Sequence, residues 1–258
     1  MIANLVELYI SALLLSLRIG PVFAFAPPFT MMKIPVVVRV LLSIAIAGWL
    51  ASALPQEFRV IEEGQLFVHM LAEVFKGLLA ALGLQIAFAA ILFVGRTLDF
   101  QAGFALALLA DPSLQSRMPL IGSFLAYAAA MVFFAGGGAN ELLALWAQSV
   151  ERSPIGAYPG ALNLSAVFSL LSVTFVSAVG LAGLVLLSLL MIDLTVGFLS
   201  RTLPQMNVLL LGFQVKSIAI LLLLPLVLSG SGLVFLNILV AALGGSADIM
   251  LGGARVGL

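Results

Sequence analysis

The sequence predicts an all-α polytopic membrane protein with about six hydrophobic helices. Of its 258 residues, 63% are hydrophobic and only 9% are charged, whereas about a quarter of the residues in an ordinary soluble domain are charged. Apolar stretches of about 20 residues, the length that crosses roughly 30 Å of hydrocarbon, recur along nearly the whole chain. Because an unpaired backbone amide or carbonyl costs several kcal/mol in lipid, each stretch is expected to be helical.

The expected helices follow one another without a linker long enough to mark a second domain, so residues 1–258 are expected to form a single membrane domain. The first segment lacks the basic start and the cleavage site of a signal peptide, and we expect it to be retained. The apolar segments lie at about 4–26, 34–54, 66–95, 119–147, 162–192 and 207–228, with a shorter apolar tail near 232–250.

Polar breaks rich in proline, glycine and charge separate these segments. They begin at Pro27 and Pro28 and recur at 55–64, 111–117, 151–160 and 200–207. Inside the fourth segment, three adjacent glycines occupy positions 136–138. Each glycine costs a helix about 1 kcal/mol relative to alanine, so a break or hinge is predicted near Gly137.

The charges between the segments give a weak prediction of topology. Six basic residues lie on one side, Lys33, Arg39, Arg96, Arg117, Arg201 and Lys216, against Arg59, Arg152 and Arg255 on the other. Cytoplasmic loops carry an excess of lysine and arginine. The loops after the first, third and fifth segments are therefore expected in the cytoplasm, with both termini outside.

Composition excludes several functional classes. Lys and Arg total 11 and Asp and Glu total 11, so there is no basic excess for binding nucleic acid. With no cysteine and one histidine, the chain offers no thiolate nucleophile and no multi-histidine metal site. No P-loop, H-E-x-x-H, G-x-S-x-G or dinucleotide-binding motif is present, so we expect no enzymatic activity and no cofactor.

Several charges lie inside the apolar segments, where each costs on the order of 3 kcal/mol or more. Arg18 lies in the first segment, Glu73 and Lys76 in the third, and Glu141 beside Asn140 in the fourth. These faces should meet protein or water rather than lipid. Glu73 and Lys76 are three positions apart and can pair on one helix face, and we favour such a local pair over a functional role.

Other residues are interpreted as structural. Glycines 77, 83 and 95, with 180 and 183, form small-residue surfaces that let membrane helices approach closely, within the chain or between subunits. Three carboxylates at segment ends, Asp99, Asp111 and Asp193, are expected to cap helices or to lie in headgroup water. His69 is expected to be a packed or boundary residue rather than a proton relay.

Two polar patches are more informative about the kind of protein than the overall composition is. In the first, Asp111 and Pro112 follow an apolar run at 104–110 and open a loop that reaches Met118. Proline forces the preceding residue out of the helical region, so a turn is expected there. The second is a polar and cationic strip at 201–207 and 212–216.

At these residues the chain resembles the FliR/SctT family, the export-gate subunit of flagellar and virulence-associated type III secretion systems. The resemblance covers nearly the whole chain and rests on the order and spacing of its motifs. They are Arg18 and Pro27, Ile34 and Pro35 with Arg39, Glu73 with Gly77, Gly103 with Asp111 and Pro112, Pro154 to Gly156, Arg201, Pro204 to Asn207, and Lys216. Relatives commonly have Gly-His where this chain reads Gly138-Ala139-Asn140-Glu141, so no role is transferred to that histidine.

The resemblance implies one copy of this subunit in a closed helical cone with FliP-like and FliQ-like subunits and a FlhB-like protein at the entrance. The cone is the channel for unfolded substrate proteins in the bacterial inner membrane. The resemblance favours a flagellar basal body over an injectisome as the system to which this chain belongs. Much of the apolar helix would then be lifted out of the bilayer and covered by neighbours.

The resemblance also implies two groups of functional residues. A plug-like loop falls on Leu106, Leu108, Leu109, Asp111, Pro112 and Met118. Contacts between subunits fall on Arg18, Glu73, Lys76, Arg201, Pro204, Gln205, Asn207 and Lys216. The alternatives are a secondary transporter for a small solute or ion, which also uses broken helices and intramembrane charges, and a membrane-bound enzyme. No convincing internal repeat supports the transporter.

Overall fold

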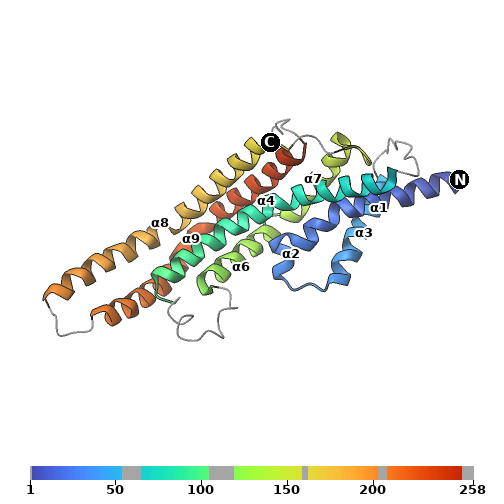
Figure 1. The fold of residues 1–258 in the computed structure, drawn as a ribbon. Helices are drawn as coiled ribbons and strands as arrows, with labels where there is room; N and C mark the ends of the chain where they lie inside the picture. Colours follow the sequence, from blue (N-terminus) through green and yellow to red (C-terminus); the bar gives the residue numbers. More distant parts are fainter. Residues whose placement is uncertain (1, 54–64, 105–118, 159–161, 203–207, 252–258) are drawn as a thin grey trace. The chain divides into compact units, whose positions relative to one another are not determined.

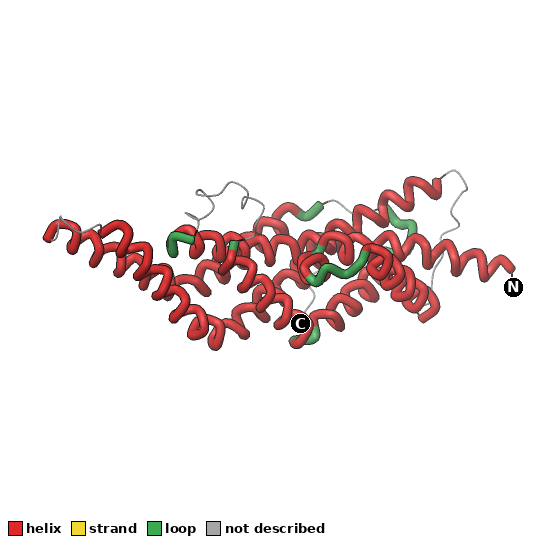
Figure 2. Tube along the Cα trace, turned by 90° about the horizontal axis from the view of Figure 1, so that it is seen from below, coloured by secondary structure: helices red, strands yellow, loops and turns green. Residues whose placement is uncertain are grey.

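The computed structural model describes residues 2–53, 65–104, 119–158, 162–202 and 208–251 (Figure 1). In this part of the chain every regular element is a helix, which confirms the all-α prediction (Figure 2). The helices are α1 (Ile2–Phe25), α2 (Pro27–Met31), α3 (Val36–Ala53), α4 (Leu66–Gln101), α6 (Leu120–Ala135), α7 (Gly138–Arg152), α8 (Leu164–Thr202) and α9 (Val208–Leu251).

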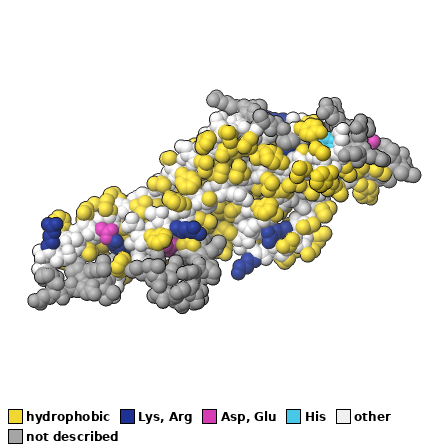
Figure 3. Space-filling model, viewed as in Figure 1, with side chains coloured by type: hydrophobic (Ala, Val, Ile, Leu, Met, Phe, Trp, Pro, Cys, Tyr) yellow, Lys and Arg dark blue, Asp and Glu magenta, His cyan; other side chains and the backbone are white. Residues whose placement is uncertain are grey.

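Five of these helices, α1, α3, α4, α8 and α9, are long and apolar enough to cross a membrane. The bent pair formed by α6 and α7 brings the number to six if it counts as one broken span. Hydrophobic side chains cover much of the face seen in Figure 3, and charged side chains are few. The expectation of about six hydrophobic helices, one of them broken, is confirmed.

The break between α6 and α7 lies where the three glycines predicted it. The two helices meet at 67°, and Gly137 has a φ of 82°, a left-handed conformation that glycine adopts without steric cost. Gly138 packs against Phe133, where a Cβ atom would lie 2.8 Å from the carbonyl oxygen of that residue. The rings of Phe133 and Phe134 pack edge-on against Phe29, with centroids 6.2 and 5.7 Å away.

Two expected boundaries were wrong. The apolar tail at 232–250 is not separate, because α9 runs unbroken from Val208 to Leu251. The hydroxyls of Ser229 and Ser231 donate to carbonyls of their own helix, so these polar residues do not end it. The break expected at Pro27 and Pro28 is present, because α1 ends at Phe25. The two prolines form the first turn of the five-residue helix α2, where a missing amide hydrogen costs nothing. Helix α8 continues to Thr202, ten residues past the expected end.

The structure divides into two compact units. Unit 1 comprises Met1–Ala87, Phe133–Ser172 and Leu239–Leu258, and unit 2 comprises Phe88–Val132 and Val173–Ile238. Side chains fully buried in unit 1 include Leu14, Ile19, Leu84 and Trp146. Those fully buried in unit 2 include Phe88, Ile91, Leu98 and Phe235.

Candidate functional site

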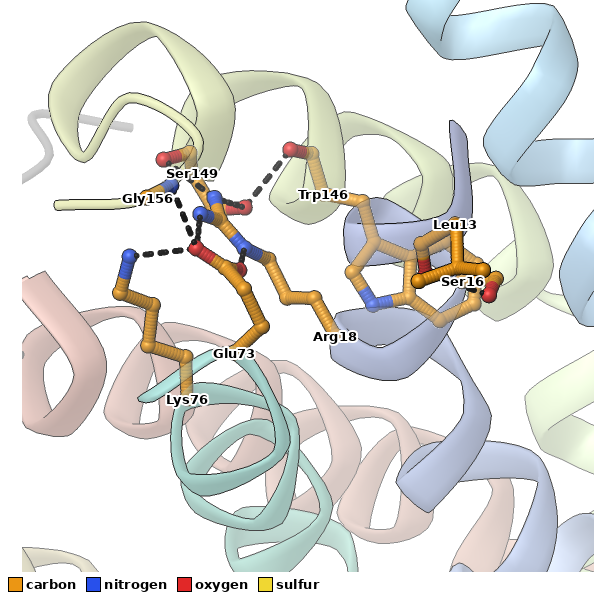
Figure 4. A network of polar contacts seen from close by, with 8 residues as sticks. All are labelled: Leu13, Ser16, Arg18, Glu73, Lys76, Trp146, Ser149 and Gly156. Carbon is orange, nitrogen blue, oxygen red and sulfur yellow. Dashed lines mark hydrogen bonds and ion pairs between the residues drawn. The ribbon is translucent and has the colours of Figure 1, made fainter. Parts of the chain in front are cut away.

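A cluster of polar groups, the Glu73 cluster (Arg18, Glu73, Lys76, Ser149 and Gly156), lies inside unit 1 (Figure 4). Glu73 Oε2 accepts a hydrogen bond from Arg18 Nε at 2.5 Å. Glu73 Oε1 accepts three more, from Arg18 Nη2 at 2.9 Å, Lys76 Nζ at 2.9 Å and the Gly156 amide at 3.1 Å. One carboxylate therefore receives four hydrogen bonds from three separate stretches of the chain.

The cluster holds two cations and one anion away from solvent. The side chains of Arg18 and Glu73 are 0% exposed and that of Lys76 is 1% exposed. Arg18 Nη1 donates to Ser149, to the carbonyl oxygen at 3.0 Å and to Oγ at 3.2 Å. Ser149 lies in the last turn of α7, where the helix dipole places partial negative charge on the carbonyls. The end of α7 thus offsets part of the excess positive charge.

The Glu73 cluster joins α1, α4 and the turn that follows α7. Close backbone packing accompanies it, since a Cβ atom on Gly77 would overlap the Arg18 carbonyl oxygen and would lie 2.8 Å from Pro21 Cγ. The predicted local pair between Glu73 and Lys76 is confirmed. The ion pair between Arg18 and Glu73 was not predicted. The sequence held one signal for it, because Arg18 and Lys76 are two cations in apolar segments and Glu73 is a carboxylate that both can bind.

A second polar anchor lies in unit 2. Asp99, near the end of α4, accepts hydrogen bonds from the Ile121 amide at 3.0 Å and the Gly122 amide at 3.3 Å. These amides belong to the first turn of α6, whose amide hydrogens have no partner within the helix. The expectation that Asp99 caps a helix is confirmed, and the capped helix is a neighbour. Gly95 meets Gly122 so closely that an added Cβ atom would overlap it.

Two of the expected interface residues lie at or near the ends of α8 and α9. Lys216 forms an ion pair with Asp193 in unit 2, and both side chains are partly exposed. The expectation that Asp193 lies at a segment end was wrong, because α8 continues beyond it to Thr202. Arg201 is exposed in the last turn of α8, where a cation interacts favourably with the helix dipole.

The remaining predicted site residues lie outside the described residues. They are the loop positions Leu106, Leu108, Leu109, Asp111, Pro112 and Met118, and the interface positions Pro204, Gln205 and Asn207. The plug and interface roles, including those of Arg18, Glu73 and Lys76, stay predictions.

His69 and three of the five glycines have the structural roles that were considered for them. His69 is 7% exposed, and its ring lies 5.7 Å from that of Tyr158, so it is a packed residue. Glycines 77, 83 and 95 touch other helices of this chain. Gly180 and Gly183 on α8 differ, because a Cβ atom on either would meet nothing within 4 Å.

Among the described residues, no group of three His, Asp or Glu side chains could hold a metal ion. The polar groups of the Glu73 cluster bond one another and the backbone. The hydrogen bonds of the Glu73 cluster are suited to holding the helices of unit 1 together. The exposed hydrophobic side chains of the described residues are suited to contacts with other apolar groups.

Comparison with known proteins agrees with this description. The family model described as bacterial export proteins, family 1, matches residues 9–241. The flagellar biosynthetic protein FliR of Bacillus subtilis is 28% identical over 220 residues, 83% of this chain and 84% of the relative. FliR of Escherichia coli is 27% identical over 202 residues, 76% of each chain. The Yop proteins translocation protein T of Yersinia pestis is 28% identical over 148 residues, 56% of this chain and 57% of the relative.

Proposed function

The chain belongs to the bacterial export proteins, family 1, and from that premise we propose that it is a structural and gating subunit of the flagellar type III export gate. In this role it forms part of the channel wall for unfolded proteins and catalyses no reaction itself. We place it in the bacterial inner membrane, together with FliP-like, FliQ-like and FlhB-like subunits. Virulence-associated relatives such as the Yersinia protein belong to the same family.

The observation that carries the proposal is the length of the apolar helices. With 39 residues in α8 and 44 in α9, the helices are about 58 and 66 Å long at a rise of about 1.5 Å per residue. The hydrocarbon core of a bilayer is only about 30 Å thick. Both helices are apolar along most of their length and little buried within the chain. Lipid alone therefore cannot cover them, and apolar partner subunits are the natural cover.

The packing of α8 supports the same proposal. Gly180 and Gly183 leave open space above the helix, and large aliphatic side chains such as Val179, Leu184 and Leu187 are exposed around them. Small residues between large ones allow a second helix to approach closely in a membrane. We expect helices of FliQ-like or FliP-like subunits to pack here.

A secondary transporter is the second candidate, because the bent pair α6 and α7 resembles the broken helices of transporters. The charges of the Glu73 cluster weigh against it. Transporter sites leave polar groups for the substrate, whereas the four hydrogen bonds to Glu73 come from this chain.

The test of the proposed function is co-purification. The tagged chain is expressed alone and with its FliP-like and FliQ-like neighbours, and both preparations are examined by size exclusion with light scattering and native mass spectrometry. We expect aggregation or low yield of the chain alone, and one defined complex containing a single copy when the partners are present. A stable, monodisperse monomer that transports a small solute in vesicles would support the transporter instead.

A further inference from the structure

Helix α3 differs in length from the long apolar helices α8 and α9. Its 18 residues give about 27 Å at a rise of about 1.5 Å per residue, close to the roughly 30 Å of the hydrocarbon core. Only 22% of this helix is buried within the chain, and its mean hydropathy is 2.1. It is thus the length of one bilayer crossing, whereas α8 and α9 are about twice that length.

The buried side of α3 is narrow and composed mostly of small residues. Ser43, Ala47, Leu50 and Ala51 are buried, and α3 packs against α1. Spacings of three and four place these residues on one stripe of the helix. The buried small residues Ser43, Ala47 and Ala51, of the kind that membrane helices use for close packing, therefore serve a contact within unit 1.

The outer face of α3 is wide and made of large apolar side chains. Its exposed positions are Val36, Val37, Val38, Val40, Leu41, Leu42, Ile44, Ala45, Trp49, Ser52 and Ala53. Eight of these eleven are large and apolar, and none carries a charge. A Cβ atom on Gly48 of this helix would meet nothing within 4 Å, as on Gly180 and Gly183 of α8. The predominantly large and apolar face of α3 suits acyl chains, which need no complementary surface.

The two ends of α3 carry residues suited to the two membrane interfaces. Lys33, exposed in the turn before the helix, offers a cation at the level of anionic phosphate headgroups. Arg39, in the first turns, bonds the backbone carbonyls of Ile34, Phe23 and Ala24, so its charge is satisfied at the end of α1. Trp49, near the other end, is 60% exposed, and tryptophan is enriched where hydrocarbon meets headgroup.

We infer that the outer face of α3 is a lipid-contacting surface that lies directly in the bilayer. Acyl chains cover Val37, Leu41 and Ile44, Lys33 lies at the phosphate level, and Trp49 lies at the opposite interface. The inference goes beyond the export-gate role, since it assigns lipid to one helix while partner subunits cover α8 and α9. It also sets the level of unit 1 in the membrane.

The absence of cysteine from the chain allows a direct test by spin labelling. Single variants Lys33→Cys, Leu41→Cys, Ile44→Cys and Trp49→Cys are labelled in the full complex and reconstituted in vesicles of phosphatidylethanolamine and phosphatidylglycerol. Collisions with oxygen, which concentrates in hydrocarbon, and with a water-soluble nickel chelate are then measured. Complex without an introduced cysteine gives the background, and Ser43→Cys on the buried stripe is the matched control.

The expected result is a depth profile. Labels at Leu41 and Ile44 should be mobile and should collide with oxygen several-fold more often than with nickel. Labels at Lys33 and Trp49 should show a smaller ratio, and the label at Ser43 should be immobile and shielded from both reagents. Immobile, oxygen-protected labels at Leu41 and Ile44, or their crosslinking to a partner subunit, would overturn the inference. Partner retention is recorded for every variant, so a failure of the export-gate proposal is seen separately.

Discussion

Arg18 and Glu73 are 55 positions apart in the sequence, yet their buried side chains meet through two parallel hydrogen bonds, Nε to Oε2 at 2.5 Å and Nη2 to Oε1 at 2.9 Å. A two-bond contact of this kind fixes orientation as well as distance. It makes the meeting of α1 and α4 specific in a protein whose other contacts are mostly apolar.

The first prediction concerns the carboxylate of Glu73. Glu73→Gln removes the anion and leaves Arg18 and Lys76 buried beside each other, and breaking a buried pair in this way typically costs about 3–5 kcal/mol. We expect a sharp fall in complex yield and in the thermal midpoint of the purified complex. Lys76→Met should be milder, because the pair of Arg18 and Glu73 remains.

A matched apolar replacement separates charge from packing in this cluster. The triple variant Arg18→Leu, Glu73→Leu, Lys76→Met buries no charge and should recover stability relative to Glu73→Gln. If Glu73→Gln were as stable as the native complex, the cluster would not be joining the helices.

The second prediction compares two glycines. Gly77→Ala should reduce the yield of folded subunit, because the added methyl group overlaps the Arg18 carbonyl oxygen. Gly180→Ala should leave the subunit folded, since nothing lies within 4 Å, but should reduce retention of partner subunits. Fluorescence-detected size exclusion with and without partners measures both effects. Full partner retention by Gly180→Ala would show that no helix packs closely there.

The third prediction concerns the cap of α6. Asp99→Ala leaves the amides of Ile121 and Gly122 without an acceptor, and each buried unpaired group costs about 1–3 kcal/mol. We expect faster hydrogen exchange in a peptide covering residues 119–125, measured by mass spectrometry. Asp99→Asn keeps one acceptor oxygen and should fall between. Glu141→Ala, on an exposed position of α7, is the control and should exchange as the native protein does.

The fourth prediction concerns the cationic strip at the ends of α8 and α9. Lys216→Ala and Arg201→Ala should each lower complex yield more than they raise permeability. The partly exposed pair of Lys216 and Asp193 is lost only in Lys216→Ala, so a loss of yield shared by both variants would come from subunit contacts. Yield is measured by native mass spectrometry and leakage by dye efflux. Unchanged yield with higher leakage would contradict the interface assignment.

The fifth prediction concerns the loop from Leu106 to Met118, which we propose closes the pore at rest. Replacing Leu108 and Leu109 with glycine removes apolar side chains that would exclude water and ions from a narrow passage. Cells should become leaky to small solutes, while protein export persists or falls modestly. The control variant Ser165→Ala, outside the loop, should do neither. A membrane that stays tight in a conductance assay, with assembly confirmed, would assign the constriction to partner subunits.

The sequence predicted the helices and the break at Gly137 because both depend on local chemistry. Apolar length and the cost of adjacent glycines are readable one segment at a time. The continuity of α9 was missed because serine hydroxyls that bond their own helix look the same in sequence as residues of a loop. The Glu73 cluster was found only in part, because pairing of Glu73 with Lys76 is local whereas the reach of Arg18 depends on tertiary packing.

The separation of Arg18 from Glu73 along the chain has a consequence for how the protein is made. Helix α1 leaves the ribosome first, and at about 5–20 residues per second the 55 intervening positions take roughly 3 to 11 s to synthesise. During that interval an unpaired guanidinium inside lipid would cost about 3 kcal/mol or more. The first helix of the nascent chain is therefore expected to stay in a polar compartment of the insertion machinery until α4 has been synthesised. The two helices would then enter the membrane together.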